Sequence, residues 1–303
     1  MIRSAAIALA TLLAACSGGS VTRVDSAPMT TAPAAISASI TPTLAPISAP
    51  AATATPQPTW DELPVPANDS TALAQQLTTV EGFIRDPSVT GDQLAWAGHL
   101  QQLAYSRLAD FPEWREPVLA ALPAAVRPAV TGSLEAGKQL RSMVVALPKS
   151  LPNWHIVQPA SIDDLLADYR EAEAKFGVPW YYLAAIHLVE TRMGRIRGDS
   201  TAGAQGPMQF IPSTWAAYGE GDINSDHDAI LAAGRYLKAS GAPGDMARAV
   251  LAYNHDSRYV AAVTDYAEVM HADPAAYRGY YGWQVYVGTK DGPVLLPVGW
   301  KKE

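Results

Sequence analysis

Apolar residues follow a helical period through most of the chain after residue 70. Leucine, valine and isoleucine recur three or four positions apart, which places them on one face of a helix. The clearest stripe is formed by Leu73, Leu77, Val80 and Ile84. A second helix is expected to open at Thr90-Gly91-Asp92 and a later one to cover 134–145, with prolines between 112 and 128 dividing shorter helices. We therefore predict a helical region over residues 70–148.

Helix boundaries are marked more sharply after residue 160. Ser161 and Asp164 have the spacing of a capping box, and the apolar pattern that they open runs to Gly177. Pro179 suits the first position of the next helix. Three further helices are expected to begin at Ser225 or Asp226, at Asp245 and at Ser257.

The C-terminal segment, residues 282–300, has a different pattern. Its β-branched and aromatic residues flank Lys290-Asp291-Gly292, which is typical of a β-hairpin. The predicted fold class is therefore mainly α (α+β), with a helical subdomain first and a small hairpin last.

The N-terminus has the features of a targeting segment. Arg3 precedes an apolar stretch from Ala5 to Leu13, which is too short to span a bilayer. Leu13-Ala14-Ala15-Cys16 resembles the lipobox of bacterial lipoproteins, in which the cysteine is lipidated. An ordinary signal peptide is the alternative. Cys16 is the only cysteine, so no intramolecular disulfide can form. We expect a lipid-anchored protein of the bacterial cell envelope, on the extracytoplasmic side of a membrane.

A low-complexity segment follows this anchor. Residues 26–60 contain no charged residue and are rich in Ala, Thr, Ser and Pro, a composition that does not support a packed core. The expected organisation is a signal peptide at 1–15, a lipidated and disordered tether at 16–60, a helical accessory subdomain at 61–150 and a catalytic domain at 151–303.

Composition narrows the classes of function. The net charge is −7 and no long Lys/Arg run occurs, which argues against nucleic acid as a partner. The sequence contains no P-loop, no G-x-G-x-x-G and no HExxH motif. We therefore expect neither an organic cofactor nor a metal, whereas a polysaccharide substrate fits the charge balance.

Glu190 is the strongest candidate for chemistry. Leu183 and Ile186 precede it by seven and four residues, so the helical period places its carboxyl group on an apolar face. Burial raises the pKa of a carboxyl group, and cleavage of a glycosidic bond needs a protonated acid because the leaving oxygen must receive a proton. The alternative is a solvated side chain at a fraying helix end, or one paired with Arg192 or Arg195.

A glycosidase of ordinary type needs a second carboxylate. The available aspartates all have the sequence context of turns or helix caps, and they are Asp199, Asp222 and Asp256. The pattern thus offers one strong acid and no convincing partner, which favours a reaction in which the substrate supplies its own nucleophile.

Polar and aromatic residues accompany the acid. Hydrogen bonds to sugar groups are expected from Ser200, Gln209, Tyr253 and Asn254, and stacking on sugar faces from Trp215 and Tyr218. Core packing for the aromatic residues and a helix-cap role for Asn254 are the alternatives. Gly194, Gly203 and Gly206 are expected to leave room for a sugar or to bring the backbone close to a ligand.

Several spaced motifs agree with one family. They are Glu190-Thr191 with Gly194, then Ser200, Ala202-Gly203-Ala204, Gly206-Pro207-Met208-Gln209-Phe210, Pro212-Ser213 and Trp215, then Asp222-Ile223-Asn224, Asp228-Ala229-Ile230 and Ala252-Tyr253-Asn254. Residues 161–270 resemble the catalytic domain of bacterial lytic transglycosylases. The Glu-Thr-x-x-Gly form is similar to that of membrane-bound murein transglycosylases.

The resemblance implies a lysozyme-like, mainly helical fold and a peptidoglycan substrate cut between N-acetylmuramic acid and N-acetylglucosamine. It implies that Glu190 protonates the glycosidic oxygen, and that its conjugate base then deprotonates the muramoyl C6 hydroxyl, leaving a 1,6-anhydro end. It also implies that Ser200 and Gln209 contact substrate, that Tyr253 orients Glu190 and that Asn254 binds near the scissile sugar. No metal or cofactor is implied.

Two other functions stay open on the sequence. One is a goose-type muramidase on the same fold, in which water replaces the C6 hydroxyl. The other is a catalytically silent lipoprotein that binds the cell wall, although a pure binding protein has no need of a buried acid.

Overall fold

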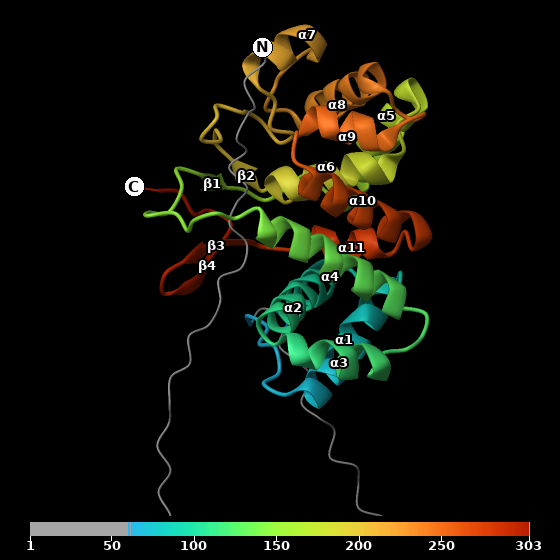
Figure 1. Ribbon diagram of the computed structural model, residues 1–303, viewed down its shortest axis with the longest axis vertical. Coiled ribbons are helices and arrows are strands. Elements are labelled where there is room, and N and C mark those ends of the chain that lie inside the picture. Colours follow the sequence, from blue (N-terminus) through green and yellow to red (C-terminus); the bar gives the residue numbers. More distant parts are fainter. Residues whose placement is uncertain (1–59, 61, 303) are drawn as a thin grey trace, which may run out of the picture. The chain divides into compact units, whose positions relative to one another are not determined.

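The computed structural model describes Trp60 and residues 62–302. The signal peptide, Cys16 and all but the last residue of the tether predicted over 16–60 lie outside the described residues. In chain order the elements are α1 Ser70–Arg85, α2 Gly91–Asp110, η1 Pro112–Trp114, α3 Arg115–Ala121, α4 Arg127–Ser142, β1 His155–Ile156, α5 Ile162–Phe176, α6 Trp180–Thr191, β2 Ile196–Arg197, α7 Pro212–Tyr218, α8 Asp226–Ser240, α9 Met246–Tyr253, α10 Ser257–Ala272, α11 Ala276–Tyr281, β3 Val285–Thr289 and β4 Gly292–Leu296 (Figure 1). The mainly helical class with a C-terminal hairpin is confirmed.

Short polar side chains begin the helices of the second half, as expected. Side-chain oxygens of Ser161, Ser225 and Asp245 accept hydrogen bonds from backbone N–H groups three residues later, at 3.1, 3.3 and 2.9 Å. Each bond satisfies a donor that the first helical turn leaves unpaired. Gly177 and Gly241 follow the last residues of α5 and α8 with positive φ values of 74° and 126°, a conformation that glycine adopts without strain.

Two expected helix starts were wrong, whereas α10 begins at Ser257 as expected, with the Asp256 side chain accepting a bond from the Arg258 N–H at 2.8 Å. Pro179 is the cap before α6 rather than its first residue. Helix α4 begins seven residues earlier than the expected 134. Pro128 lies in its first turn, where the missing N–H has no intrahelical partner to lose, so this proline does not break the helix.

Helix α10 lies between α6 and α4 and packs against both (Figure 1). By their contacts the described residues form one compact unit. A single hydrophobic cluster contains residues from α1–α4 and from α5–α11. The boundary that we expected at residue 150 therefore does not separate two cores, and the accessory helices share the core of the helices around α6.

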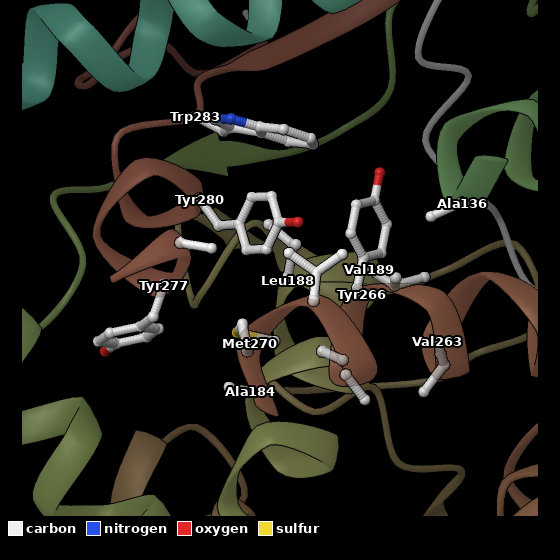
Figure 2. Packing of buried hydrophobic residues seen from close by; sticks show 14 of the residues in the cluster. Ala136, Ala184, Leu188, Val189, Val263, Tyr266, Met270, Tyr277, Tyr280 and Trp283 are labelled. Atoms are coloured by element: carbon white, nitrogen blue, oxygen red, sulfur yellow. The ribbon is translucent and has the colours of Figure 1, made fainter. Parts of the chain in front are cut away.

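Three aromatic rings fill the junction between α10 and α11 (Figure 2). Tyr266, Tyr280 and Trp283 lie edge to face, with ring centroids 5.1 to 5.9 Å apart and interplanar angles from 77° to 82°. The Tyr280 hydroxyl is 2.6 Å from the Ser133 hydroxyl of α4. Because such pairs add to the area that they bury, this group helps to fix α4 and α11 around α10.

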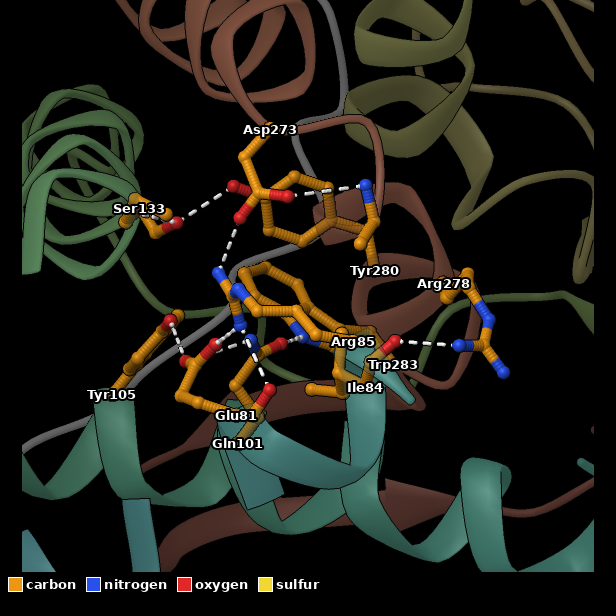
Figure 3. A network of polar contacts seen from close by, with 12 residues as sticks. Glu81, Ile84, Arg85, Gln101, Tyr105, Ser133, Asp273, Arg278, Tyr280 and Trp283 are labelled. Carbon is orange, nitrogen blue, oxygen red and sulfur yellow. Dashed lines mark hydrogen bonds and ion pairs between the residues drawn. The ribbon is translucent and has the colours of Figure 1, made fainter. Parts of the chain in front are cut away.

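A buried carboxylate joins the accessory helices to α11 (Figure 3). Glu81 of α1 is 1% exposed and forms an ion pair with Arg85, which also pairs with Asp273 just before α11. Glu81 accepts further bonds from Gln101 at 3.0 Å and from the Tyr105 hydroxyl at 2.7 Å. A buried charge needs this number of partners, so the network constrains how α1, α2 and α11 meet.

A second, smaller core lies beneath the strands. Strands β3 and β4 pair antiparallel around the predicted Lys290-Asp291-Gly292 turn. Strands β1 and β2 also pair antiparallel, and they were not predicted because a strand of two residues is too short to show a period. Apolar side chains from both pairs form a separate cluster, which consists of Trp154, Ile156, Ile196, Val285, Val287 and Leu296.

Candidate active site

Glu190 is the second-last residue of α6, a helix that is buried on nearly every side. Its side chain is buried, with 8% of the residue exposed. The described residues place no Arg or Lys within 4 Å of its carboxylate, so the expected alternatives of a solvated or Arg-paired side chain were wrong. The helical period thus predicted the environment of this acid correctly.

The hydroxyl of Tyr259 donates a hydrogen bond of 2.6 Å to Glu190 Oε1. Burial raises the pKa of Glu190 to about 7, and the bond from Tyr259 opposes part of this rise. Burial also keeps the pKa of Tyr259 well above its ordinary value, so the phenol stays protonated and acts as the donor. The site therefore holds a carboxylic acid that is partly protonated near neutral pH, as proton donation to a leaving group requires.

Three side chains, one within the loop and two from helices α6 and α9, hold the loop that follows β2. The Gln209 amide donates to the Gly206 carbonyl oxygen at 2.9 Å, and the Thr191 hydroxyl donates to that of Pro207 at 2.6 Å. The Tyr253 hydroxyl donates to the carbonyl oxygen of Met208, also at 2.6 Å. Three consecutive carbonyl groups are thus bound by residues of the three sequence motifs, which fixes the loop against the end of α6.

Tyr253 was expected to orient Glu190, and this expectation needs a correction. Its hydroxyl binds Met208, while Tyr259 makes the direct hydrogen bond to the acid. Tyr253 is close enough that the charge of Glu190 raises its pKa further, after burial. Tyr259 was missed because it lies on an ordinary apolar stripe of α10. The available signal was that a tyrosine on a buried helix face needs a partner for its hydroxyl.

The chain turns sharply after the acid. Arg192, Met193 and Gly194 all have positive φ, at 55°, 56° and 83°. We expected Gly194 to leave room for a sugar, and this was wrong. A Cβ atom at Gly194 would lie 2.5 Å from a carboxylate oxygen of Asp226, so the glycine admits the start of α8 rather than a ligand.

The absence of a side chain at Gly206 is also explained by packing within the protein. Its φ is 70°, and a Cβ atom there would lie 2.0 Å from the carbonyl oxygen of Ile223. The close approach that we expected at this glycine is made by another loop of the protein and not by a ligand. Gly203 differs, because its φ is 79° but the space around it is open.

Ser200 is buried and organises its own loop. Its hydroxyl oxygen accepts hydrogen bonds from the N–H groups of Ala202 and Ala204, at 3.2 and 3.0 Å. This arrangement fixes the turn that precedes Gln209. The hydroxyl hydrogen is not used in these two bonds.

Asn254 carries an unpaired donor. It follows the last residue of α9, is 7% exposed, and its Oδ1 accepts a bond from the Asp256 N–H at 3.2 Å. Among the described residues its amide nitrogen has no hydrogen-bond partner. A buried N–H group without an acceptor costs about 1–3 kcal/mol, so this position suits a ligand that supplies one.

Partly buried aromatic rings continue from this point. Tyr253 lies between Phe210 and Tyr236, with centroids 5.9 and 5.7 Å away. Trp215 packs on Phe210 and Tyr218 packs on Tyr236. Trp215 and Tyr218 are thus partly committed to packing, and both keep some exposed surface.

The three aspartates considered as second carboxylates have structural roles in turns and caps. Asp222 accepts a bond from the Asn224 N–H at 2.9 Å, and Asp256 caps α10 and pairs with Arg258. Asp199 is exposed, 3.5 Å from the Gln205 amide. Among the described residues, no carboxylate contributes to the pKa shift of Glu190. In the described part of the chain, Glu190 therefore has no second carboxylate close by.

The histidines do not form a metal centre within the described part of the chain. No group of three or more His, Cys, Asp or Glu side chains there is arranged to hold a metal ion. His187, three residues before the acid, is fully buried and hydrogen-bonds the Tyr169 hydroxyl at 2.8 Å. Its position is explained by packing between α5 and α6.

Comparison with known families decides what this arrangement is. Residues 168–268 match the family model described as Transglycosylase SLT domain. This segment is a lytic transglycosylase catalytic domain. The SLT domain makes the protein an enzyme that acts on peptidoglycan. No curated protein and no solved structure matches the chain.

The SLT domain runs from within α5 to within α10. It contains the acid, the loop held by the three carbonyl bonds, Asn254 and the missed Tyr259. Its limits agree with the range 161–270 over which the sequence resembled this family. A cell-wall substrate places the protein at the envelope, and no helix among residues 62–302 is both long and apolar enough to cross a membrane.

Proposed function

We propose that the protein cleaves the β-1,4 bond between N-acetylmuramic acid and N-acetylglucosamine with Glu190 as its only acid and base, leaving 1,6-anhydromuramoyl ends. The observation that carries the proposal is a buried carboxyl group with a pKa raised to about 7, in contact with a tyrosine donor and with no carboxylate partner nearby. This electrostatic setting suits one group that works in both protonation states.

In the first step the protonated Glu190 donates its proton to the glycosidic oxygen as the bond from C1 to that oxygen breaks. The leaving N-acetylglucosamine keeps both electrons of the bond and the proton, so it departs as a neutral alcohol. The Glu190 carboxylate remains, and the hydrogen bond from Tyr259 stabilises its charge.

In the second step the Glu190 carboxylate takes the proton of the muramoyl C6 hydroxyl while that oxygen forms a bond to C1. The proton returns to Glu190, no water is consumed, and the acid is ready for the next cycle. A pKa near 7 serves both steps, because neither protonation state is strongly disfavoured.

The remaining polar groups are proposed to hold the substrate. The unpaired amide nitrogen of Asn254 would donate to a sugar or acetamido oxygen, and Ser200 and Gln209 would contribute further bonds from the fixed loop. Tyr253 would shape the site by holding that loop. The exposed parts of Trp215 and Tyr218 would stack on sugar faces.

Mass spectrometry of soluble products from purified sacculi tests the reaction. The wild-type chain is expected to release anhydromuramoyl fragments, and Glu190→Gln is expected to release none above background. Reducing muramic ends, heavier by one water, would instead identify a muramidase that activates water. Binding to sacculi without release of fragments from either protein would identify a non-catalytic wall-binding protein.

We also propose that the protein is lipid-anchored through Cys16 on the extracytoplasmic side of a bacterial membrane. Metabolic labelling with a radioactive fatty acid is expected to label the wild-type chain and not Cys16→Ser. Equal labelling of both chains, or of neither, would favour an ordinary cleaved signal peptide or another route to the envelope.

A further inference from the structure

A cavity of about 80 Å³ lies among helices α2, α4 and α10, the turn after α6, and the hairpin, and it is partly open to solvent. Its enclosed part has room for a small head group, and a longer ligand would extend into the opening. Its wall is mainly apolar and includes four aromatic rings, which belong to Tyr105, Tyr266, Trp283 and Tyr286. Figure 2 shows the rings of Tyr266 and Trp283 from this wall, with Tyr280 packed against both of them. None of the residues that we assign to proton transfer or to sugar binding lines this cavity.

Two arginines give the apolar cavity a positive charge. Arg192 lines it although only 4% of the residue is exposed, and its Nε has no hydrogen-bond partner among the described residues. One guanidinium N–H donates to the Leu188 carbonyl oxygen at 2.7 Å, and the group lies 5.7 Å from the centre of the Trp283 ring. Arg141 lines the cavity from α4.

Asp110 and Glu135 offset part of the charge of Arg141, whereas no carboxylate of the described residues offsets that of Arg192. No carboxylate of the described residues lies within 4 Å of either guanidinium group. Asp110 is the acidic residue in the cavity wall, and its charge interacts with Arg107 and Arg141. Burial lowers the pKa of Arg192 to about 10 and also lowers that of Arg141. A buried cation with an unused donor is unfavourable unless a counter-ion binds it.

We propose that this cavity is a second ligand site, separate from the glycan site, that binds a monoanionic amphiphile. A carboxylate would accept hydrogen bonds from Arg192 and Arg141, and an aliphatic or aromatic body would lie against Trp283, Tyr266 and Leu140. Because Arg192 is two residues after Glu190, the site opens on the turn that follows the catalytic acid.

The wall excludes other classes of ligand. A free sugar needs many hydrogen-bond partners, and this wall is mostly apolar. A cation would be repelled by two guanidinium groups, and a polyanion would meet Asp110 as well as the arginines. A single carboxylate on an apolar body matches both the charge and the surface.

Isothermal titration calorimetry with octanoate tests the proposal on the purified chain. Octanamide and octylamine serve as neutral and cationic probes of the same length, and acetate carries the charge without the body. We expect octanoate to bind saturably and the other three probes to bind at least about tenfold more weakly. Octanamide and octylamine lose the charge-assisted hydrogen bonds to arginine, and acetate loses the apolar contact.

Variants locate the site. Gly137 lines the cavity on α4, and a Cβ atom there would point at Arg141 with a separation of 3.1 Å. Gly137→Leu is therefore expected to fill the cavity and abolish octanoate binding. Gly82→Leu is the matched control, since it adds the same side chain to a helix where nothing lies within 4 Å. Arg141→Gln should weaken octanoate binding about tenfold and leave octanamide binding unchanged.

Three results would overturn the proposal. The first is that octanoate shows no saturable binding to the wild type, which would mean that the cavity holds water only. The second is equal affinity for octanoate and octanamide, and the third is that Gly137→Leu binds octanoate with wild-type affinity. Circular dichroism checks that Gly137→Leu is folded, and if it is not, the comparison of Arg141→Gln with the wild type decides alone. Failure of this test leaves the cleavage reaction untouched, because sacculus digestion reports that separately.

Discussion

Replacing the buried Glu190 by glutamine should make the protein more stable at neutral and alkaline pH. Glu190 has a pKa raised from 4.5 to about 7 by burial. The folded state therefore holds a proton that the unfolded state releases between these two values. Stability is unaffected below pH 4.5, falls as the pH rises toward 7, and stays reduced above 7. Glu190→Gln removes this loss, because the amide is neutral at every pH and keeps an oxygen that can accept the bond from Tyr259.

The expected size follows from the shift. Each pKa unit corresponds to about 1.4 kcal/mol, so the difference between 4.5 and about 7 corresponds to about 3 kcal/mol at pH 8. At pH 4 only a few tenths of a kcal/mol are expected, since the carboxyl group is mostly protonated in both states. In a chain of this size each kcal/mol shifts the melting temperature by roughly 2–4 °C.

Urea unfolding of the wild type and Glu190→Gln at pH 4, 6 and 8 measures this effect. The difference in unfolding free energy between the two proteins is the quantity to follow, because other titrating groups cancel in it. Glu116→Gln, on the exposed surface of α3, is the control and should show no change with pH. If the difference for Glu190→Gln were the same at pH 4 and pH 8 within about 0.5 kcal/mol, the acid would not be desolvated and the reasoning would fail.

Three further predictions concern the groups around the acid. Cleavage by the wild type should fall as the pH rises through about 7, because the first step needs protonated Glu190. The hydrogen bond from Tyr259 lowers the pKa of Glu190, so Tyr259→Phe should raise this pKa and move the fall in activity to higher pH. pH–rate profiles of kcat/KM on muropeptides check both expectations, and an unchanged profile would mean that Tyr259 does not affect the protonation of Glu190. Thr191→Val removes the hydroxyl that donates to a buried carbonyl oxygen, so it should destabilise the fold by about 1–3 kcal/mol and lower cleavage. Calorimetry and sacculus digestion measure the two effects, and an unchanged melting temperature would contradict this prediction. Gly206→Ala should destabilise the fold by more than about 2 kcal/mol, because its new Cβ atom would contact the Ile223 carbonyl oxygen and its φ is positive. Gly203→Ala, where the surrounding space is open, should destabilise the fold by about 1 kcal/mol. Equal losses of stability in denaturant titrations of the two variants would refute the steric argument.

Local patterns were enough for the parts of the fold that depend on neighbouring residues. The capping serines, the glycines after α5 and α8 and the hairpin turn were all predicted, because each depends on hydrogen bonds or φ values within a few residues. The burial of Glu190 was predicted for the same reason, since its helix carries the apolar period. The family motifs indicated the lytic transglycosylase domain, because they depend only on the order of residues along the chain.

Contacts between distant segments decided the rest. Tyr259 meets Glu190 across 69 positions of the chain, and no local period indicates which tyrosine on α10 faces the acid. The purposes of Gly194 and Gly206 also depended on Asp226 and Ile223, which approach from other loops. Likewise, the sharing of one core between α1–α4 and the catalytic helices follows from where α10 packs.

The sequence by itself therefore determined that Glu190 is buried on an apolar helix, where most of the helices begin and end, and which family the segment around it resembles. The tertiary structure decided which tyrosine donates a hydrogen bond to Glu190, which glycines serve packing within the protein, and where an arginine is buried with no carboxylate of the described residues beside it. The physical reason is the range of the interactions: capping and periodicity act within one element, whereas desolvation and hydrogen bonding at the site depend on every element that packs around it.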